Sequence, residues 1–489
     1  MAKIVIVGGG VAGLSAGIYA RLAGHSAVVC ERHHIAGGNL TGWNRSGYHI
    51  DNCIHWLTGT NPASHLYKMW VDLGVLGEGI EIVQCDSLFT AEKDGKRLSL
   101  PPSLKELRRA MLEHSKGDNR EIDKFIHAIE LIEASDHVAG EKCNEGMTPS
   151  RLAKGVGPLM KYYKLTTGQL AGRFNSPVIR SFITGFWGED FSSLALIYVF
   201  ATYCGKNGAL PRGGSLKSAE RMVERFKELG GRLRLRCEAV RVNLLDGVAK
   251  SVTFADGSVE EADYVILTTD PASTFGSLVD LPMPKQMDKL YHIPDMRRFS
   301  SYHCAYACDE TELPFEGDLI FDIPKEYEKD LGTKQLIVRE FSHEPSYSPE
   351  GKNILQTMTF CYEEDSKAFI EMQKKDKKAY QERKRHISEV LKKLIEEHEP
   401  KLRGKLTLID SWTPATYNKF VNSQIGSFMS FAIPSNYLPS TVSGKIAGCK
   451  NMFMATQWQS PPGGLPTAAM CGRDAVRRIL KMEKAHARA

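Results

Sequence analysis

The N-terminal segment places a glycine-rich turn directly between a buried strand and a helix. Residues 3–7 (Lys-Ile-Val-Ile-Val) are a continuous β-branched run, which is typical of a buried parallel strand. The next six residues, Gly8 to Gly13, match the pattern GxGxxG, and residues 14–23 have the composition of a helix that ends at Gly24. A second strand is expected over residues 26–30. Strand, glycine turn, helix and strand in this order predict a Rossmann-like α/β unit.

Each part of this unit has a physical role in binding a dinucleotide. Gly8 permits the tight turn, Gly10 lets the backbone approach a pyrophosphate, and Gly13 lets the helix pack closely on the strand. The helix N-terminus, at Val11 and Ala12, presents free N–H groups to the phosphates. Glu31 lies 18 residues after Gly13, where its carboxylate can accept hydrogen bonds from ribose hydroxyls. The alternative is an ordinary glycine-rich turn.

The residues after Glu31 indicate which dinucleotide is bound. Arg32 is followed by Gly37-Gly38, by Asn39, and then by an aromatic residue and an acid within residues 48–51. This stretch resembles the flavoprotein superfamily that includes amine oxidases and phytoene desaturases. In that superfamily the extension follows the cofactor toward its flavin end, and nicotinamide dehydrogenases do not carry it. The resemblance implies FAD, with Arg32, Gly37, Gly38 and Asn39 among its contacts.

A second glycine-rich segment lies near the other end of the chain. An apolar strand over residues 451–455 leads into residues 456–466 (TQWQSPPGGLP), and a helix is predicted over residues 467–483. Pro466 suits a first helical turn, and the positive helix end would lie near the N1/O2 edge of a flavin. The segment resembles the closing FAD motif of the phytoene desaturase family, which includes carotenoid isomerases and retinol saturases. The resemblance adds Trp458, Gly464, Leu465 and Pro466 to the expected cofactor contacts.

The middle of the chain carries another glycine turn and a series of strands. Residues 209–216 resemble the Pro-x-Gly-Gly turn of the same family, before a helix expected over residues 215–229. Strands are predicted over residues 232–235, 237–242, 249–254 and 264–269, and Asp256-Gly257 between two of them predicts a hairpin. In related proteins the backbone at the position of Val240 meets the adenine. The alternative is a valine with no role beyond its strand.

These segments predict an α/β protein with a discontinuous cofactor domain. We expect a Rossmann-like FAD-binding domain of the GR2 flavoprotein type from residues 1–100, 205–285 and 405–489. A mixed-sheet and helical substrate domain is inserted into it, from residues 101–204, which form a helical cap, and residues 286–404. Further expectations are helical spacing over residues 119–138, mixed aromatic and polar residues over 147–200, strands over 299–306, 335–340 and 354–362, and an exposed helix or helix pair over 366–398.

The segment after Asp51 is where redox chemistry is expected. The family often has a histidine at the position of His55, and an imidazole can give or take a proton near neutral pH. The alternative is a histidine that only binds a loop or the cofactor. Cys53 is either a small packing residue or a redox-active thiol. No ligand set typical of zinc occurs, so no metal is expected.

The resemblance implies an FAD-dependent oxidoreductase that acts on carbon–carbon bonds of an apolar, isoprenoid or polyene substrate by hydride transfer at flavin N5. Desaturation, saturation and isomerisation all stay open. Aromatic residues between Phe182 and Tyr203 would line a tunnel for such a substrate or fill a helical core. A flavin amine oxidase is one alternative. A non-catalytic prenyl-binding escort protein is another, although the intact dinucleotide motif argues against it.

Partners and location follow from composition and from missing motifs. The chain has no second Rossmann motif for NAD(P)H. A nicotinamide would therefore have to visit the flavin transiently as an electron donor, or the flavin would pass its electrons to a quinone, oxygen or another protein. A net charge of only +5 over 489 residues does not argue for nucleic acid. Eleven cysteines without a CxxC pair, and no signal pattern, indicate reduced thiols in the cytoplasm. No run of 18 apolar residues occurs, so we expect at most peripheral membrane contact; the oligomeric state stays open.

Overall fold

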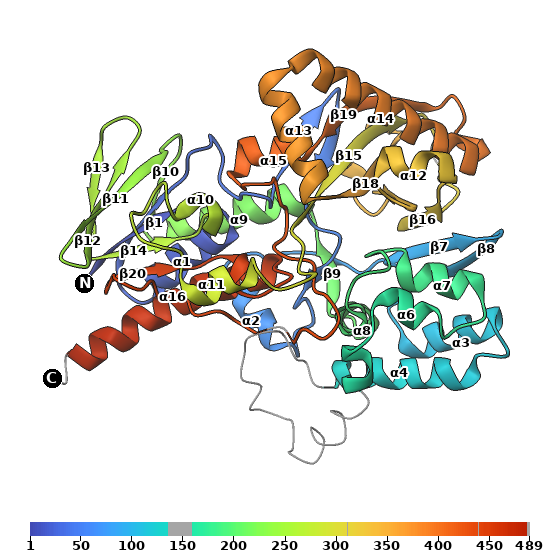
Figure 1. Ribbon diagram of the computed structural model, residues 1–489, viewed down its shortest axis with the longest axis horizontal. Coiled ribbons are helices and arrows are strands. Elements are labelled where there is room, and N and C mark those ends of the chain that lie inside the picture. The colour runs from blue at the N-terminus through green and yellow to red at the C-terminus, as the bar shows by residue number, and fades with distance from the viewer. Residues whose placement is uncertain (135–158, 311, 439, 487–489) are drawn as a thin grey trace.

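The computed structural model describes residues 1–134, 159–310, 312–438 and 440–486. Two large sheets organise these residues (Figure 1). The first sheet has five parallel strands in the order β10-β2-β1-β14-β20. They are β1 (Lys3–Val7), β2 (Ser26–Cys30), β10 (Arg232–Arg234), β14 (Tyr264–Leu267) and β20 (Met452–Met454).

Alternate residues of β1 bury opposite faces of this sheet. Ile4 and Ile6 belong to an apolar cluster with α1 (Val11–Leu22), α9 (Gly214–Glu228) and α16 (Leu465–His486). Val5 and Val7 belong to a second cluster with an antiparallel sheet of β11 (Ala239–Leu245), β12 (Val248–Phe254) and β13 (Val259–Glu261). The first and last long helices pack together, and Ser15 Oγ of α1 donates to the Ala469 carbonyl of α16 at 2.7 Å.

The second sheet is mixed and has seven strands in the order β19-β15-β18-β17-β16-β7-β8. Every neighbouring pair is antiparallel except β16 with β7. The strands are β7 (Phe89–Lys93), β8 (Lys96–Ser99), β15 (Phe299–Cys308), β16 (Asp318–Asp322), β17 (Gln335–Glu340), β18 (Asn353–Tyr362) and β19 (Leu406–Trp412).

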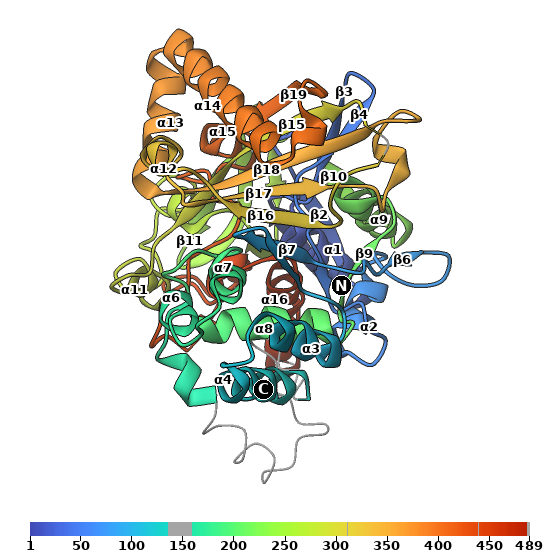
Figure 2. The same ribbon diagram turned by 90° about the vertical axis from the view of Figure 1, so that its right-hand side faces the viewer.

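Helices cover the second sheet on both faces, as Figure 2 shows. Above it lie α12 (Lys325–Leu331), α13 (Glu363–Lys375), α14 (Lys377–His398) and α15 (Pro414–Val421). Below it lie α3 (Leu104–His114), α4 (Asn119–Glu133), α6 (Thr167–Ala171), α7 (Pro177–Thr184) and α8 (Ser193–Cys204). Shorter elements connect the layers: β3 (Gly42–Arg45), β4 (Tyr48–Asp51), β5 (Leu57–Thr58), α2 (His65–Asp72), β6 (Ile82–Val83), β9 (Gly208–Pro211), α10 (Pro271–Thr274), α11 (Lys285–Leu290), and single turns at Pro345–Tyr347, Pro400–Leu402 and Gln457–Gln459.

The predicted architecture, a Rossmann-like cofactor domain with an inserted mixed-sheet domain, is confirmed. Three strands join the second sheet although they lie in ranges expected to belong to the cofactor domain, residues 1–100 and 405–489. β7 and β8 precede residue 100 and β19 follows residue 405, yet all three belong to the second sheet, because β7 pairs with β16 and β19 pairs with β15. The expected helical spacing up to Val138, and residues 147–158, extend outside the described residues.

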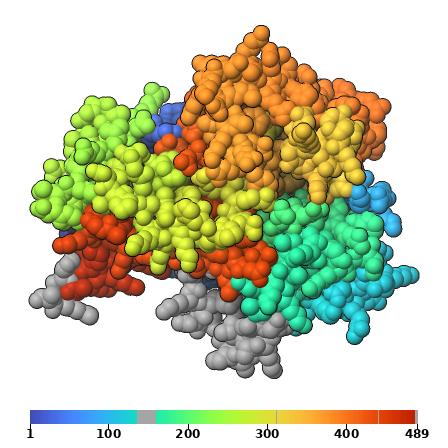
Figure 3. Space-filling model, viewed as in Figure 1, coloured from blue at the N-terminus to red at the C-terminus, as the bar shows by residue number. Residues whose placement is uncertain are grey.

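The surface in Figure 3 is formed mainly by the middle and C-terminal segments, with most of the first hundred residues behind them. Within the described parts of the chain, none of the helices combines the length and the apolar composition that a membrane span needs.

Candidate functional site

A large cavity runs from the turn after β1 to the helices below the second sheet. Its volume is about 1550 Å³, whereas a pocket for one small ligand usually has about 300–1,000 Å³. Of the residues predicted at the site, all but Gly13 line it. They are Gly8, Gly10, Val11, Ala12, Glu31, Arg32, Gly37, Gly38, Asn39, His55, Val240, Trp458, Gly464, Leu465 and Pro466.

The turn between β1 and α1 forms one wall of the cavity. Gly8 has a φ of 104°, which an L side chain rarely adopts. A Cβ added to Gly10 would only be in ordinary contact with Gly37 and Gly38, at 3.9 Å, and Gly10 lines the cavity. A Cβ at Gly13 would instead lie 1.9 Å from the carbonyl oxygen of Gly8. The start of α1 therefore offers unpaired N–H groups to a space that a pyrophosphate can occupy.

Two backbone N–H groups hold Glu31 at the end of β2. Its Oε2 accepts from the N–H of Gly9 at 2.7 Å, and its Oε1 accepts from the N–H of His33 at 2.8 Å. A carboxylate has about four lone-pair sites, so it keeps acceptor capacity for ribose hydroxyls. Val240, 45% exposed, lies three residues after Cys237, whose N–H donates to the Glu31 carbonyl at 2.8 Å. The structure therefore brings the predicted ribose and adenine contacts together.

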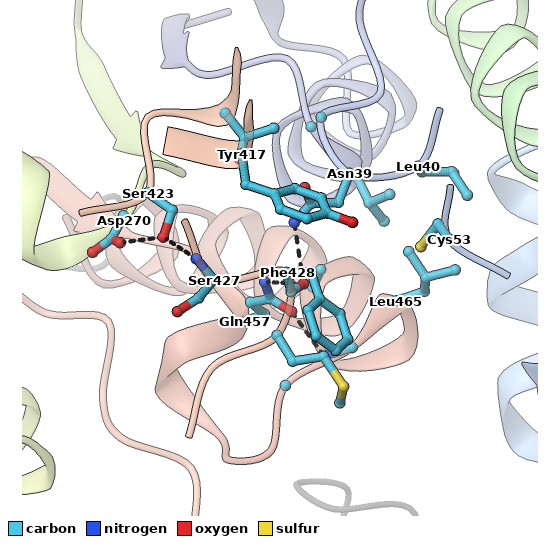
Figure 4. Close-up of a pocket in the computed structure, with 18 of the residues that line it drawn as sticks. Asn39, Leu40, Cys53, Asp270, Tyr417, Ser423, Ser427, Phe428, Gln457 and Leu465 are labelled. Atoms are coloured by element: carbon cyan, nitrogen blue, oxygen red, sulfur yellow. Dashed lines mark hydrogen bonds between the residues drawn. The ribbon is translucent and has the colours of Figure 1, made fainter. Parts of the chain in front are cut away.

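The chain around Asn39 meets the C-terminal segment farther along the cavity (Figure 4). Asn39 Nδ2 and Gln457 Nε2 both donate to the carbonyl oxygen of Phe428, at 3.1 and 3.3 Å. Gln457 Oε1 accepts from the N–H of Gly464 at 2.9 Å. The hydrogen bonds of Gln457 fix the turn that precedes α16, which begins at Leu465. The positive end of that helix therefore lies in the cavity wall.

Arg32 and Trp458 line the cavity but also make contacts with the protein. Arg32 donates from its guanidinium to the carbonyl oxygen of Lys419 at the end of α15. The Trp458 ring is buried against Phe431, with centroids 5.1 Å apart and rings nearly perpendicular. Their predicted role in cofactor binding stays a prediction.

Three polar residues of the same wall, Asp270, Ser423 and Ser427, are absent from the sequence prediction (Figure 4). Asp270 accepts from Ser423 Oγ at 3.1 Å, and Ser423 Oγ accepts from the N–H of Ser427 at 2.9 Å. Burial raises the pKa of the Asp270 carboxyl. Asp270 lies shortly after β14, at the strand edge where α/β sheets bind ligands, and this position could have identified it. The two serines lie in a loop that gives no such signal.

Tyr417 and Cys53 also line this part of the cavity (Figure 4). Tyr417 donates from its hydroxyl to Asn52 Oδ1 at 2.9 Å and accepts from Trp412 Nε1 at 3.0 Å. Burial raises the pKa of the Cys53 thiol to about 12. Because the thiolate is the reactive form, this environment favours the packing role of Cys53 over the redox role.

His55 lies in the loop between β4 and β5. Its Nδ1 is 2.9 Å from Oδ2 of Asp318, and its ring meets Phe186 edge to face with centroids 5.9 Å apart. Burial, helped by the nearby Arg339 guanidinium, lowers the pKa of His55 below its ordinary value. The imidazole is therefore neutral at neutral pH and can take up or return a proton at the cavity wall.

Beyond Phe186 the cavity continues between β18 and the helices below the sheet. We call this part the apolar arm. None of the described residues that form it is charged, and four of them share one face of α8. The apolar arm is lined by Ile132, Leu159, Met160, Phe186, Trp187, Phe191, Leu194, Ala195, Tyr198, Val199, Met358, Phe360, Ile433 and Leu438.

The cavity fits a flavin dinucleotide on several observations. Gly10 lines the cavity and a Cβ there would meet nothing closer than 3.9 Å, which leaves room for phosphates beside it, and Glu31 is oriented for a ribose. Asn39 Oδ1 and Ser427 Oγ are buried cavity atoms with no hydrogen-bond partner among the described residues. Buried polar atoms normally have partners, so these two are available to the polar edge of an isoalloxazine ring.

One group of possible metal ligands occurs among the described residues, at Glu92, His398 and Glu399. Arg97 already donates to both glutamates and offsets part of their charge. The ten cysteines within the described ranges are all free thiols.

The model of the family described as flavin containing amine oxidoreductase matches residues 11–480. The chain belongs to this family. As a member of this family it is an enzyme with a flavin cofactor, which argues against the non-catalytic escort protein.

Curated relatives of this amine oxidoreductase family member are distant. 4,4'-diapolycopene oxygenase of Methylomonas sp is 22% identical over 516 aligned residues, which covers 96% of each chain. Phytoene desaturase of Fusarium fujikuroi is 22% identical over 388 residues, 72% of this chain and 65% of that protein. One of the subunits of limonene dehydrogenase from Castellaniella defragrans is 24% identical over 316 residues, 59% of this chain and about half (55%) of that protein.

Solved structures of the same fold include an oxidoreductase from Methanosarcina mazei, with a TM-score of 0.63 at 16% identity, covering 97% of this chain and all of that one. A putrescine oxidase variant has a TM-score of 0.62 at 15% identity, covering 98% and 99% of the two chains. At these identities the likeness shows the fold alone. The predicted resemblance to the carotenoid desaturase-like flavoproteins is confirmed by the curated relatives.

Proposed function

We propose that this enzyme binds FAD and transfers a hydride between flavin N5 and a carbon of an apolar, isoprenoid or polyene substrate. The product gains, loses or shifts a carbon–carbon double bond. The apolar arm carries this proposal, because it extends the cavity from His55 and Phe186 and is lined mainly by apolar and aromatic side chains, none of them charged. Limonene, phytoene and diapolycopene, named in the curated relatives, belong to the same substrate class.

An amine fits the apolar arm less well than a hydrocarbon. A buried ammonium group without a partner is costly. The carboxylates that line the cavity, Glu31, Glu238, Asp270 and Asp410, all lie outside the arm. Amines therefore serve as the contrasting substrates in the test.

The test mixes FAD-loaded protein with candidate substrates without oxygen and records the flavin absorbance. Limonene and phytoene are offered in detergent micelles, and cyclohexylamine and putrescine in buffer. We expect an isoprenoid either to bleach the oxidised flavin or to be converted by flavin that has first been reduced, and the amines to leave the flavin oxidised. Bleaching by an amine and by no isoprenoid would overturn the proposal.

Parallel mixing with NADH and NADPH determines the direction of the reaction. Rapid reduction by a nicotinamide would indicate a saturase or an isomerase that needs reduced flavin. Flavin that only the organic substrate reduces would indicate a desaturase, which passes its electrons to another acceptor.

We infer that the apolar substrate enters through peripheral contact with a membrane. Met160 and Leu438 line the apolar arm and are 37% and 53% exposed, so they offer an apolar rim. Flotation with phosphatidylcholine vesicles tests this contact. The double variant Met160→Glu/Leu438→Glu should lose binding, and equal flotation of variant and wild type would contradict the inference.

A further inference from the structure

Three charged or titratable side chains form a row behind the cavity wall. His55 Nδ1 lies 2.9 Å from Asp318 Oδ2, and Asp318 Oδ1 lies 3.4 Å from Arg339 Nε. Asp318 and Arg339 are only 6% and 5% exposed. Arg339 also donates from Nη2 to the carbonyl oxygen of Ile54 at 2.9 Å. The row therefore ties the loop that carries His55 to β16 and β17.

The charges of Asp318 and Arg339 offset each other. Burial raises the pKa of the Asp318 carboxyl, but Arg339 and His55 lower it by more, so it is ionised at neutral pH. Arg339 supplies a permanent positive charge. A neutral imidazole next to this ion pair is the arrangement that leaves no net charge buried.

A neutral imidazole beside a carboxylate has one favoured tautomer. Nδ1 keeps its proton and donates it to Asp318, which leaves the lone pair on Nε2. Among the residues that the structure describes, Asp318 is the one hydrogen-bond partner of the ring. Nε2 therefore has no protein partner while the ring borders the large cavity.

His55 also lines a second, small cavity of about 20 Å³, which is room for one water molecule. Asp318, Arg339, Glu340 and His343 line it too, so such a water has several polar partners. His343 is half-buried, and its carbonyl accepts from Arg212, which pairs with the exposed Glu81. The small cavity is therefore a polar space beside the His55 ring.

We propose that Asp318 and Arg339 are positioning residues that hold His55 as a neutral imidazole whose Nε2 exchanges a proton with the substrate. This inference rests on the proposed function. In the desaturating direction, one substrate carbon gives a hydride to the flavin and its neighbour gives a proton to Nε2. A carbon–carbon double bond forms and the flavin is reduced. The imidazolium is stabilised by Asp318 and gives the proton on Nε2 to water once the product has left, which restores the Nδ1–H tautomer; saturation runs in reverse.

Two substitutions should move the pKa of His55 in opposite directions. Asp318→Asn removes the carboxylate that stabilises the imidazolium, so the pKa falls. Arg339→Gln removes the nearby positive charge, so the pKa rises. Other titratable groups around the ring are Asp51 on β4, His303 on β15, and Glu340 and His343 at the end of β17; they are unchanged in both variants. A role confined to packing predicts no such opposed shifts.

The measurement is nuclear magnetic resonance of ¹⁵N-histidine-labelled, FAD-loaded protein, with the His55 signals assigned by their loss in His55→Gln. In the wild type we expect the Nδ1–H tautomer and a pKa below the ordinary value. The matched control is Asp330→Asn, which removes a carboxylate 2.7 Å from the exposed His386 and should leave His55 unchanged. If Arg339→Gln fails to fold, the double variant Asp318→Asn/Arg339→Gln removes both charges together and should return the pKa toward the wild-type value.

A rate measurement completes the test. The rate of anaerobic flavin reduction is measured with the isoprenoid that reduces wild-type flavin fastest. Asp318→Asn should lower this rate about 10²-fold or more, as expected for a lost proton-transfer group. An Nε2–H tautomer in the wild type, or pKa shifts of the same sign in both variants, would overturn the inference. So would flavin reduction that is insensitive to Asp318→Asn, and that result would leave the proposed function intact. The expected pKa shifts with no conversion of any isoprenoid, by oxidised or by reduced flavin, would contradict the proposed function alone.

Discussion

The Cβ position of Gly13 lies 1.9 Å from the carbonyl oxygen of Gly8, so α1 touches the end of β1 at this point. Three residues earlier, the Cβ position of Gly10 has no neighbour closer than 3.9 Å. Two glycines of one motif therefore have different roles. Gly13 permits a contact within the protein, and Gly10 leaves space for a ligand.

Gly13→Ala should destabilise the protein itself. The new methyl group meets backbone, which cannot rotate away, and overpacking of this kind costs about 1–3 kcal/mol or more. The midpoint of thermal unfolding of the FAD-free protein should fall by several degrees. An unchanged midpoint would mean that α1 does not lie this close to β1.

Gly10→Ala should leave the fold intact and abolish cofactor retention. Its φ of −73° is open to alanine, and the methyl group would enter the space assigned to the phosphates. The FAD-free variant should unfold at the wild-type temperature. After reconstitution with FAD and dialysis, its flavin absorbance per protein should be near zero. A wild-type value would contradict the placement of the phosphates at this wall.

Glu31→Gln should weaken FAD binding about 10- to 100-fold. A hydrogen bond to a charged group contributes about 1.5–3 kcal/mol, and 1.4 kcal/mol corresponds to a factor of ten. Fluorescence titration of the FAD-free protein measures the affinity. Glu238→Gln is the control, because that side chain lines the same cavity but is 56% exposed. Equal affinities for wild type and Glu31→Gln would contradict the ribose assignment.

Ala195→Trp should obstruct the apolar arm without affecting FAD. Ala195 lies on the face of α8 that lines the arm, together with Leu194, Tyr198 and Val199. We expect the KM for phytoene to rise about tenfold or more, the KM for the shorter limonene to change less, and the flavin content to stay constant. Glu371→Trp, on the exposed side of α13, is the control for an added indole. Unchanged kinetics with phytoene would place the substrate elsewhere.

The buried His303 should make stability depend on pH. Its ring stacks on Trp412 with centroids 4.7 Å apart, and burial lowers its pKa well below the ordinary value. The unfolded chain regains a pKa near 6.5, so below that pH it binds a proton that the folded state does not. Stability is complete above about pH 6.5 and falls by up to about 1.4 kcal/mol for each unit below it.

His303→Gln should therefore flatten the decline of the unfolding temperature between pH 6.5 and 5. The exposed His386→Gln provides the comparison and should leave the slope unchanged. An identical slope for wild type and His303→Gln would show that His303 is not the group that titrates.

The parts of the fold predicted from the sequence are those encoded by consecutive residues. β1, β2 and the turn between β1 and α1 lie where the pattern places them, because an apolar run and its glycines are read within 30 residues. β17 has the predicted bounds Gln335–Glu340 for the same reason. β7, β8 and β19 lie in ranges expected to belong to the cofactor domain, yet they belong to the second sheet, because β7 pairs with β16 and β19 pairs with β15, both far away along the chain.

The candidate site shows the same limit. Glycines and acids of the cofactor motifs follow one another in sequence, so the pattern identifies them. Asp318 lies 263 residues from His55, and no local pattern connects them. Such a pair becomes visible only when the fold brings β16 of the second sheet beside the loop that carries His55.

The docking of α16 on α1 has a consequence for how the enzyme is made. Ser15 and Ala469, joined by one hydrogen bond, are 454 residues apart, and a Cβ at Gly472 would lie 2.2 Å from the Ala12 carbonyl. A ribosome releases α1 long before it reaches α16. The growing polypeptide therefore has only part of the wall that contacts a flavin. Cofactor loading must wait until translation has passed α16. A premature stop codon shortly before α16 would yield a colourless protein.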